Sequence, residues 1–331
     1  GDFASGNHGF VFALQVLPII VFFASLIAVL YHLGIMERLV SLIGGLIQFV
    51  LGTSKAESMS AATNIFIGQS EAPIAIKPYL SSMSSSEIFA VMVGGMATVS
   101  GSVLGGYAAA GVDMRYLIAA SFMAAPAGLM MAKLIKPGAS DDSSDNFDVH
   151  EEILANRSAN VIDAAATGAL QGMQLAFAIG ALLLAFIGLI ALINGIIGWG
   201  GSFFGFENLT MQQILGYLFQ PVAFLIGVPW EETRQVGSLL GQKFMLNEFI
   251  AYLDFVANYQ SELTPRTQAI VTFALCGFAC LSSIAIVVGG IGILVPERRA
   301  EMSQLGLLAV VAATLANLMS ATIAGLMLTL S

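Results

Sequence analysis

The sequence predicts an all-α polytopic membrane protein built from inverted repeats, with two re-entrant helical hairpins and two unwound transmembrane helices. Of its 331 residues, 57% are hydrophobic and 10% are charged, whereas soluble domains carry about 25% charged residues. Several apolar runs approach the length of about 20 residues that a helix needs to cross a bilayer. Two polar-centred segments also recur in the same order relative to later apolar runs. So few polar side chains cannot cover a surface in water, and the predicted surrounding is a lipid bilayer.

The longer apolar runs, taken in order, predict the membrane helices. Complete spans are expected at 10–31, 116–134, 165–199 and 305–330. Two further runs carry small polar residues in their middle. The run 89–110 has them at 98–102, and the run 269–295 has them at Ser282 and Ser283. Interrupted helices of this kind line polar sites in transporters, so both runs are predicted to be broken in the middle.

Two shorter apolar runs do not reach the length of a span. The run 39–51 is interrupted by Gly44 and Gly45 and is expected to be interfacial or re-entrant. The run 214–228 is broken by Pro221, because proline lacks the backbone donor that a helix interior requires.

Two segments, 56–83 and 231–261, are too polar to face lipid, yet each has short apolar stretches around a charged centre. The centres are GQSEAP at 68–73 and LNEF at 246–249. One interpretation is a surface loop in both cases. The sharper one is a pair of re-entrant hairpins, because non-helical backbone survives at membrane depth when protein or a wet cavity surrounds it.

The same order of elements then occurs twice, as a polar-centred segment, a broken run and a complete span. Paired interrupted segments in two halves of a chain indicate the binding site of a secondary transporter. The chain is predicted to divide into five parts. A scaffold span with an interfacial helix occupies 1–55, a first transport repeat 56–136, and a polar connecting loop 137–164. A second scaffold part with the long span occupies 165–230, and a second transport repeat occupies 231–331. The connecting loop holds a group of acids that we interpret as a solvated stretch, namely Asp141, Asp142, Asp145, Asp148, Glu151 and Glu152.

Several classes of function are excluded. The net charge of −9 comes without a basic stripe, so nucleic acid is not an expected partner. There is no P-loop and no nucleophile elbow, which argues against an ATP-driven pump and against an enzyme. The two cysteines, Cys276 and Cys280, are expected on one face of a helix, where i,i+4 spacing is poor geometry for a disulfide.

The polar centres supply the candidate binding residues. Glu71 and Glu248 are the acids most deeply embedded in the repeats, and a carboxylate at the bilayer centre costs about 2.5–3.5 kcal/mol on insertion scales. A proton, a cation or a ligand rich in hydroxyl and amine donors would offset that cost. The neighbouring amides and the glycine that begins the first centre complete a neutral-ligand site, with Gln69, Asn247 and Gly68. Acids in water-exposed loops remain the alternative.

A sodium site is the second candidate. Sodium binds hard oxygens, many of them carbonyls of unwound backbone and of half-helix ends. Asn64 offers an amide oxygen and Thr98 a hydroxyl, and the carbonyls of Ile67 and Val99 would be available if the helices break there. The alternative is that Asn64 and Thr98 act as helix caps.

Three motifs together resemble the concentrative nucleoside transporters. The stretch 226–252 reads IGVPWEETRQVGSLLGQKFMLNEFIAY and is similar to the family signature of a small residue, a lysine and Asn-Glu-Phe followed by an aliphatic residue, alanine and an aromatic residue. The family elements are matched by Gly241, Lys243, Asn247, Glu248, Phe249, Ile250, Ala251 and Tyr252. GQSEAP at 68–73 resembles the other hairpin tip, and ALCGFA at 274–279 resembles a later helix. As a set, the motifs cover most of the chain in order.

The resemblance implies a role for each matching position. It implies that the nucleobase is bound by Gln69, Ser70, Glu71 and Val103. It implies that Glu248 and Ser283 bind the ribose and that Phe278 packs on the nucleoside. The sodium position of the sodium-coupled members maps onto Asn64, Thr98 and the carbonyls of Ile67 and Val99.

The resemblance also implies a setting for the chain. Members are homotrimers in which a transport domain moves against a fixed scaffold. The expected function is therefore import of nucleosides such as uridine or adenosine by sodium symport, with elevator-type alternating access, in a bacterial inner membrane. Proton-coupled symport, and a nucleoside-sensing or channel protein, are the alternatives.

Two departures from the family pattern bear on the site. Members usually carry asparagine two residues after the phenylalanine of GFA, and here that position is Cys280. A thiol is a weak donor and acceptor, so one contact to the ligand is expected to be weaker. Bacterial members also usually begin with further helices before the span at 10–31.

Overall fold

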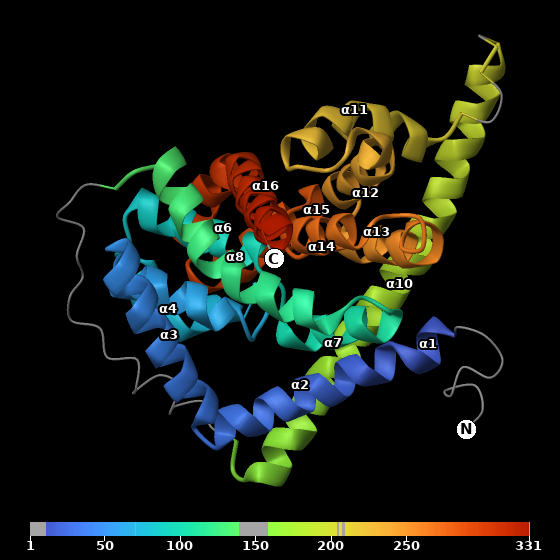
Figure 1. Ribbon diagram of the computed structural model, residues 1–331. Coiled ribbons are helices and arrows are strands. Elements are labelled where there is room, and N and C mark those ends of the chain that lie inside the picture. The colour runs from blue at the N-terminus through green and yellow to red at the C-terminus, as the bar shows by residue number, and fades with distance from the viewer. Residues whose placement is uncertain (1–10, 70, 139–157, 204, 207–208, 331) are drawn as a thin grey trace.

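The computed structural model describes residues 11–69, 71–138, 158–203, 205–206 and 209–330, and within these ranges every regular element is a helix (Figure 1). The all-α prediction is therefore confirmed. In this described part, five helical stretches are long and apolar enough to cross a membrane, at Phe12–His32, Ser85–Ala110, Met114–Ile135, Val161–Ser202 and Pro296–Leu330. The acids of the predicted connecting loop lie outside the described residues.

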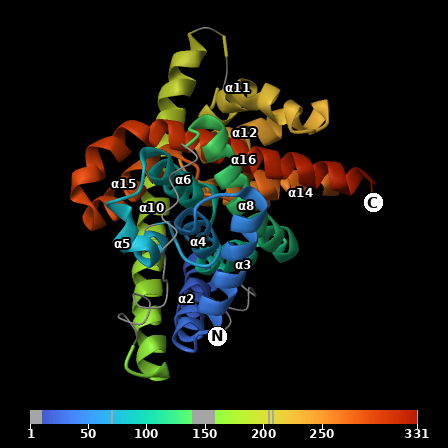
Figure 2. The same cartoon turned by 90° about the vertical axis from the view of Figure 1, so that its left-hand side faces the viewer.

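Two helices form the long outer edge of the molecule. α1 (Phe12–Gln15) leads into α2 (Leu17–His32), and α2 packs along α10 (Val161–Ser202). At 1.5 Å per residue α10 is about 63 Å long, twice the thickness of a hydrocarbon core, and Figure 2 shows it running past the other helices at both ends. These elements confirm the spans predicted at 10–31 and 165–199.

Small residues bring α2 and α10 together. A Cβ atom built on Gly168 would lie 2.5 Å from Ala28 Cβ, and one on Gly172 would lie 2.7 Å from Ala24 Cβ. The four-residue spacing on both helices places these glycines and alanines on facing sides. Close backbone approach through small residues is how helices associate in lipid.

Two shorter helices differ from the prediction in their continuity. α3 (Ile35–Leu51) is unbroken at Gly44 and Gly45, and α11 (Met211–Leu225) is unbroken at Pro221. Gly44 is where α3 packs on α4, because a Cβ there would lie 2.6 Å from Met59 Sδ. Its missing side chain therefore permits a helix–helix contact, and the predicted interruptions were wrong.

The first predicted repeat begins with a short helix that ends in a turn. α4 (Lys55–Asn64) starts with a capping box of Ser54 and Glu57. The chain then turns through residues 65–71, called the first tip, of which Ser70 lies outside the described residues. It returns through η1 (Ala72–Ile76) and α5 (Lys77–Leu80). Glu57 is buried and pairs with Lys133 Nζ at 2.6 Å, which ties α4 to α8.

A broken helix and a span follow. α6 (Ser85–Ala97) and α7 (Gly101–Ala110) are separated by the non-helical residues 98–100, called the first break. α8 (Met114–Ile135) is the next span. The Gly101 amide donates to Phe66 O at 3.0 Å, so the first tip is hydrogen-bonded to the backbone just after the first break. The prediction of a helix broken near 98–102 is confirmed.

The second predicted repeat has the same order of elements. It comprises η2 (Trp230–Glu232), α12 (Thr233–Met245), α13 (Glu248–Asp254), the π-helical η3 (Phe255–Tyr259), α14 (Pro265–Leu275), α15 (Leu281–Leu294), η4 (Pro296–Arg298) and α16 (Arg299–Leu330). Residues 246–247 join α12 to α13, and together with Glu248, the first residue of α13, they are called the second tip. Residues 276–280, called the second break, separate α14 from α15.

The position of the second break corrects two expectations. The prediction placed it at Ser282 and Ser283, but those residues belong to the first turn of α15. Cys276 and Cys280 stand at the two ends of the break instead of on one helix face. Composition pointed to the polar serines, whereas the backbone opens earlier, at the Cys-Gly-Phe-Ala-Cys stretch.

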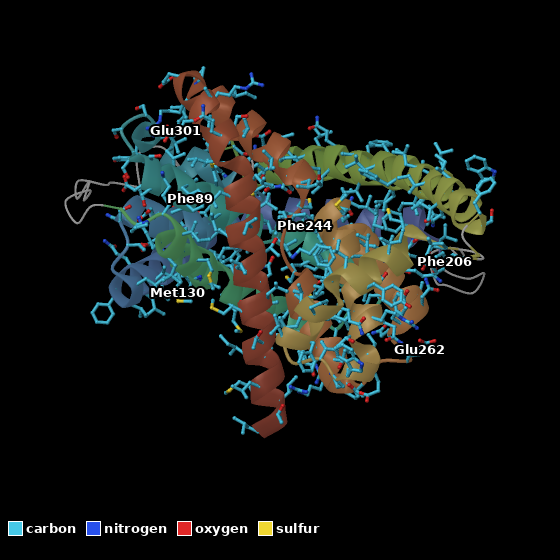
Figure 3. All side chains as sticks on the ribbon, turned by 90° about the horizontal axis from the view of Figure 1, so that it is seen from above. Phe89, Met130, Phe206, Phe244, Glu262 and Glu301 are labelled. Atoms are coloured by element: carbon cyan, nitrogen blue, oxygen red, sulfur yellow. The ribbon has the colours of Figure 1, made fainter. Side chains whose placement is uncertain are left out.

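The span of each repeat packs on the broken helix of its own repeat and also on that of the other repeat. α8 packs on α6 and also on α14, and α16 packs on α14 and also on α6. Figure 3 shows α16 running between Phe89 and Met130 on one side and Phe244 on the other. The first and second breaks are thereby brought against each other near the middle of the molecule, where the Phe278 amide donates to Thr98 O at 3.2 Å.

Candidate functional site

A cavity of about 770 Å³ opens between the two tips, the two broken helices, α2 and α10. Every described residue of the predicted substrate set lies in its wall, namely Gly68, Gln69, Glu71, Val103, Asn247, Glu248, Phe278, Cys280 and Ser283. The remaining predicted residue, Ser70, lies outside the described residues. Positions more than 200 residues apart in the chain therefore face one space.

Glu248 is the buried acid of this cavity, with 6% of its surface exposed. It is the first residue of α13, and its neighbour Asn247 caps that helix by accepting a bond from the Ile250 amide at 2.9 Å. Glu248 Oε1 accepts a hydrogen bond from the Tyr107 hydroxyl at 2.9 Å. One carboxylate oxygen is thus fixed by the protein, in a cavity where the carboxylate can also accept hydrogen bonds from a ligand.

Tyr107 was not among the predicted residues. It lies on α7, fully buried, with its ring 4.5 Å from the Tyr252 ring and 5.1 Å from the Phe249 ring. The sequence held a signal for it, because Tyr107 follows Val103 by four residues and so shares its helix face. What the sequence could not show is that this face meets Glu248.

Glu71 differs from Glu248 in being exposed. It ends the first tip and has an exposed side chain on the cavity wall. The surface-loop interpretation is therefore wrong for Glu248, which is buried, while Glu71 is accessible through the cavity. Beside it, Gln69 is buried and its Oε1 has no hydrogen-bond partner in the part of the chain that is described. An amide oxygen without a donor is available to a ligand.

The second break contributes a ring, a thiol and a hydroxyl. Phe278 is half-buried in the cavity wall. Cys280 Sγ lies 3.2 Å from both Ser282 Oγ and Ser283 Oγ, within hydrogen-bond distance for sulfur. Cys280 directly precedes α15, and Ser283 lies in the first turn of that helix, in the cavity wall.

The predicted cation residues gather beside the cavity, at the first tip and first break. Asn64 is 1% exposed; its amide nitrogen donates to Ser60 O at 3.0 Å, while its Oδ1 has no partner among the described residues. The Thr98 hydroxyl donates to Gly94 O at 2.8 Å and keeps its lone pairs free to accept. Leaving a buried acceptor unpaired costs about 1–3 kcal/mol, and a bound cation would remove that cost.

The first tip fits tightly against α6 at this place. A Cβ atom built on Gly95 would lie 3.1 Å from Gln69 Cβ and 3.8 Å from Asn64 Oδ1. One on Gly68 would lie 3.9 Å from Ser100 Cβ. No described donor reaches the carbonyl oxygens of Ile67 and Val99 in the backbone network. The first tip and the first break, which carry the carbonyls suggested for sodium, are thus packed close together, and Asn64 Oδ1 faces the same stretch of α6.

Two further polar residues were missed as site residues. Lys243 Nζ donates to Ala274 O and to Asn317 Oδ1, each at 2.8 Å. Asn317 Nδ2 in turn donates to Ala97 O at 2.7 Å and to Cys276 O at 3.1 Å. Lys243 belonged to the recognised motif but received no role. Asn317 gave a weaker signal, as an amide within the apolar run 305–330.

Two family models match successive parts of the chain. A model described as nucleoside recognition matches residues 13–114, and one described as the C-terminus of Na⁺-dependent nucleoside transporters matches residues 116–325. The chain belongs to the concentrative nucleoside transporter family. The resemblance seen in the sequence motifs is thereby confirmed.

Relatives of this family come from bacteria and mammals. The nucleoside permease NupC of Helicobacter pylori is 52% identical over 98% of this chain and 78% of its own length. An uncharacterised transporter of Haemophilus influenzae is 54% identical over 97% of this chain and 78% of its own length. Human sodium/nucleoside cotransporter 1 is 41% identical over 96% of this chain and 51% of its own length. These relatives are transporters, which confirms a multi-pass membrane transporter and not an enzyme.

Solved structures of a concentrative nucleoside transporter, CNTnw, share the fold. An inward-facing, substrate-bound structure is 55% identical and superimposes with a TM-score of 0.93, covering all of this chain and 79% of that one. An outward-facing structure of a variant gives 0.92, covering 99% of this chain and 78% of that one. The fold is thus similar to that of a transporter whose structure is known in both an inward-facing and an outward-facing state.

Proposed function

We propose that this chain imports nucleosides by sodium symport, and that it does so as a secondary active transporter with elevator-type alternating access. The observation that carries the proposal is the buried Asn64 Oδ1, which lacks a donor among the described residues and lies beside the tip that lines the cavity. A cation at that oxygen and a ligand at Glu71 and Glu248 would share the first tip.

The cavity chemistry supports a nucleoside as the ligand. Its volume falls within the range of about 300–1,000 Å³ that small-molecule sites occupy. We assign the nucleobase to Gln69, Ser70, Glu71 and Val103. We assign the ribose to Glu248 and Ser283, with Gly68, Asn247 and Cys280 nearby and Phe278 packing on the nucleoside. An ionised carboxylate is the stronger kind of acceptor for ribose hydroxyls, so Glu248 is the main anchor.

The cation proposal follows from the oxygens at the first break. Sodium bound by Asn64 Oδ1, the Thr98 hydroxyl and the carbonyls of Ile67 and Val99 would join α4, the first tip and the first break. Gln69 and Glu71 lie on that tip, so ion binding would hold them in the geometry that a nucleobase needs. This is how one ion could raise the affinity for the nucleoside.

The larger arrangement supports a moving transport domain. In this proposal the two polar-tipped segments are re-entrant hairpins in inverted repeats. Because α8 and α16 each pack on helices of both repeats, the two repeats would move as one body. The scaffold would contain α2 and α10, with the divisions 1–55, 56–136, 137–164, 165–230 and 231–331 as proposed domains. Relatives solved in inward-facing and outward-facing states agree with such a motion. We propose a homotrimer in a bacterial inner membrane.

Uptake by proteoliposomes tests the function. Radiolabelled uridine should accumulate when sodium is imposed outside, and accumulation should stop when choline replaces sodium or an ionophore collapses the gradient. Accumulation driven by outside acid without sodium would replace sodium by proton coupling, with Glu71 or Glu248 as the carrier. Equilibration that ignores both gradients would indicate a channel, and failure to take up uridine or adenosine would refute nucleoside transport.

A further inference from the structure

Lys243 and Asn317 form a buried junction between the two broken helices. Lys243 is 3% exposed and its ammonium reaches Ala274 O, near the end of α14, and Asn317 Oδ1 on α16. The Asn317 amide nitrogen reaches Ala97 O, at the end of α6, and Cys276 O, in the second break. Two side chains therefore bind carbonyls at the C-terminal ends of both first half-helices.

Those carbonyls need partners for a physical reason. The last carbonyls of a helix have no intrahelical donor, and at membrane depth no bulk water replaces the missing bond. Helix C-termini also carry partial negative charge, which a lysine ammonium stabilises. In this way, the junction lets two helices stop inside the membrane, directly before the first and second breaks.

The junction is adjacent to both proposed binding sites. Ala97 precedes Thr98, whose hydroxyl belongs to the proposed cation site. The carbonyl of the same Thr98 accepts the Phe278 amide at 3.2 Å, and Phe278 lies in the wall of the cavity. A single backbone hydrogen bond therefore joins the first break to the second. Lys243 also lies five residues before Glu248 in the chain, in the last turn of α12, which leads into the second tip.

The second break is packed so closely against α6 and α16 that it has little room to move relative to them. Gly277 lies between Asn317 and the end of α6, and a Cβ atom built on it would come within 2.5 Å of Ala97 O. The crossing is thus packed backbone against backbone, with Asn317 filling the remaining space. A displacement of Thr98 would be passed to the second break through these contacts.

We infer that Lys243 and Asn317 are a positioning pair that carries the linkage between cation binding and nucleoside binding, by keeping the first and second breaks in register. The inference rests on the proposed sodium coupling and adds the route through which one site acts on the other. Neither residue lines the cavity. Their effect on a nucleoside therefore passes through Phe278 and the second tip.

Calorimetry of uridine binding to the purified protein tests the inference. The dissociation constant is measured in sodium chloride and in choline chloride of equal ionic strength, and the ratio of the two is the coupling factor. Coupling between linked ligands is typically about 5- to 150-fold. In Lys243→Met and in the milder Asn317→Ser, the coupling factor should fall to about 1, while uridine still binds in choline.

Lys133→Met is the matched control. Lys133 also pairs with a buried group, Glu57, but it contacts neither break. Its loss should lower the melting temperature but leave the coupling factor at the wild-type value, which would show that a general loss of stability does not by itself remove the coupling. If Lys243→Met does not purify folded, Asn317→Ser decides the question.

Three other outcomes would contradict the inference. Folded variants with the wild-type coupling factor would overturn the positioning role. So would variants that bind no uridine in either salt, because the pair would then support the nucleoside site alone. A wild-type protein whose affinity ignores sodium would instead refute the proposed symport, and the linkage with it, before any variant is compared.

Discussion

The first and second tips are built on one plan but differ in how a buried polar group is satisfied. Near the end of α4, Asn64 leaves its Oδ1 without a partner among the described residues. Near the end of α12, Lys243 delivers an ammonium that binds two acceptors at 2.8 Å. One half of the molecule presents an oxygen that can receive a cation, and the other half contains a cation already.

This difference separates an exchangeable site from a permanent one. A helix that ends in a membrane beside a broken neighbour leaves several carbonyls to be satisfied. An ion can do this reversibly, which is the role that the proposed symport gives to sodium at the first tip. A lysine does it at all times, and the same proposal leaves the second tip to bind the nucleoside. The predictions below test that division, from the largest expected effect to the smallest.

Glu248→Gln should have the largest effect, because the second tip would lose its ionised acceptor for the ribose. Hydrogen bonds to charged groups contribute about 1.5–3 kcal/mol each, so loss of two should lower uridine uptake by about 100-fold or more. The measurement is initial uptake rate in proteoliposomes. Glu297→Gln, at an exposed acid of η4, is the control. Near-normal transport by Glu248→Gln would remove it from the site.

Asn64→Ala should shift the sodium requirement and not the maximal rate. Loss of one oxygen ligand at about 1.4 kcal/mol raises the sodium concentration for half-maximal uptake by about tenfold. A sodium titration of uptake measures this. Asn258→Ala removes an exposed amide from η3 and should leave the titration as it is. An unchanged curve for Asn64→Ala would place the ion elsewhere and end the contrast between the two tips.

Tyr107→Phe should weaken nucleoside binding by a smaller factor. The ring contacts with Phe249 and Tyr252 remain, while the bond to Glu248 Oε1 is lost. A hydrogen bond worth about 1–1.5 kcal/mol corresponds to a five- to tenfold rise in the dissociation constant of uridine. Calorimetry measures it, with Tyr116→Phe on α8 as the control. Unchanged affinity would mean that Tyr107 only fills space.

Cys280→Asn should produce the smallest change, and in the opposite direction. An amide is a better donor and acceptor than a thiol, and this position lines the cavity beside Ser283. Nucleoside binding should tighten by about threefold, as expected for a gain of roughly 0.7 kcal/mol. Cys276→Ser, whose sulfur lies against Leu117 O, should bind uridine as the wild type does. Equal or weaker binding by Cys280→Asn would contradict the claim.

Much of the fold could be read from the sequence because its causes are local. Lipid selects long apolar runs, so the complete spans appeared directly in the hydropathy. The first break could also be predicted, because small polar residues interrupt an apolar run at 98–102. Glu71 and Glu248 stood out because acids are rare in such a chain. The resemblance to the family assigned roles to these positions, and both acids lie in the wall of the cavity.

Only the tertiary structure decided where helices continue and which distant groups meet. α3 continues through Gly44, where α4 packs closely against it. α14 can end before Cys276 because Lys243 binds the Ala274 carbonyl and Asn317 binds the Cys276 carbonyl. Asn317 lies 74 residues from Lys243 and 220 from Ala97 in the chain. Hydropathy and motifs report on neighbours along the chain. Satisfying a carbonyl inside a membrane depends on neighbours in space, and these appear only when the helices have packed.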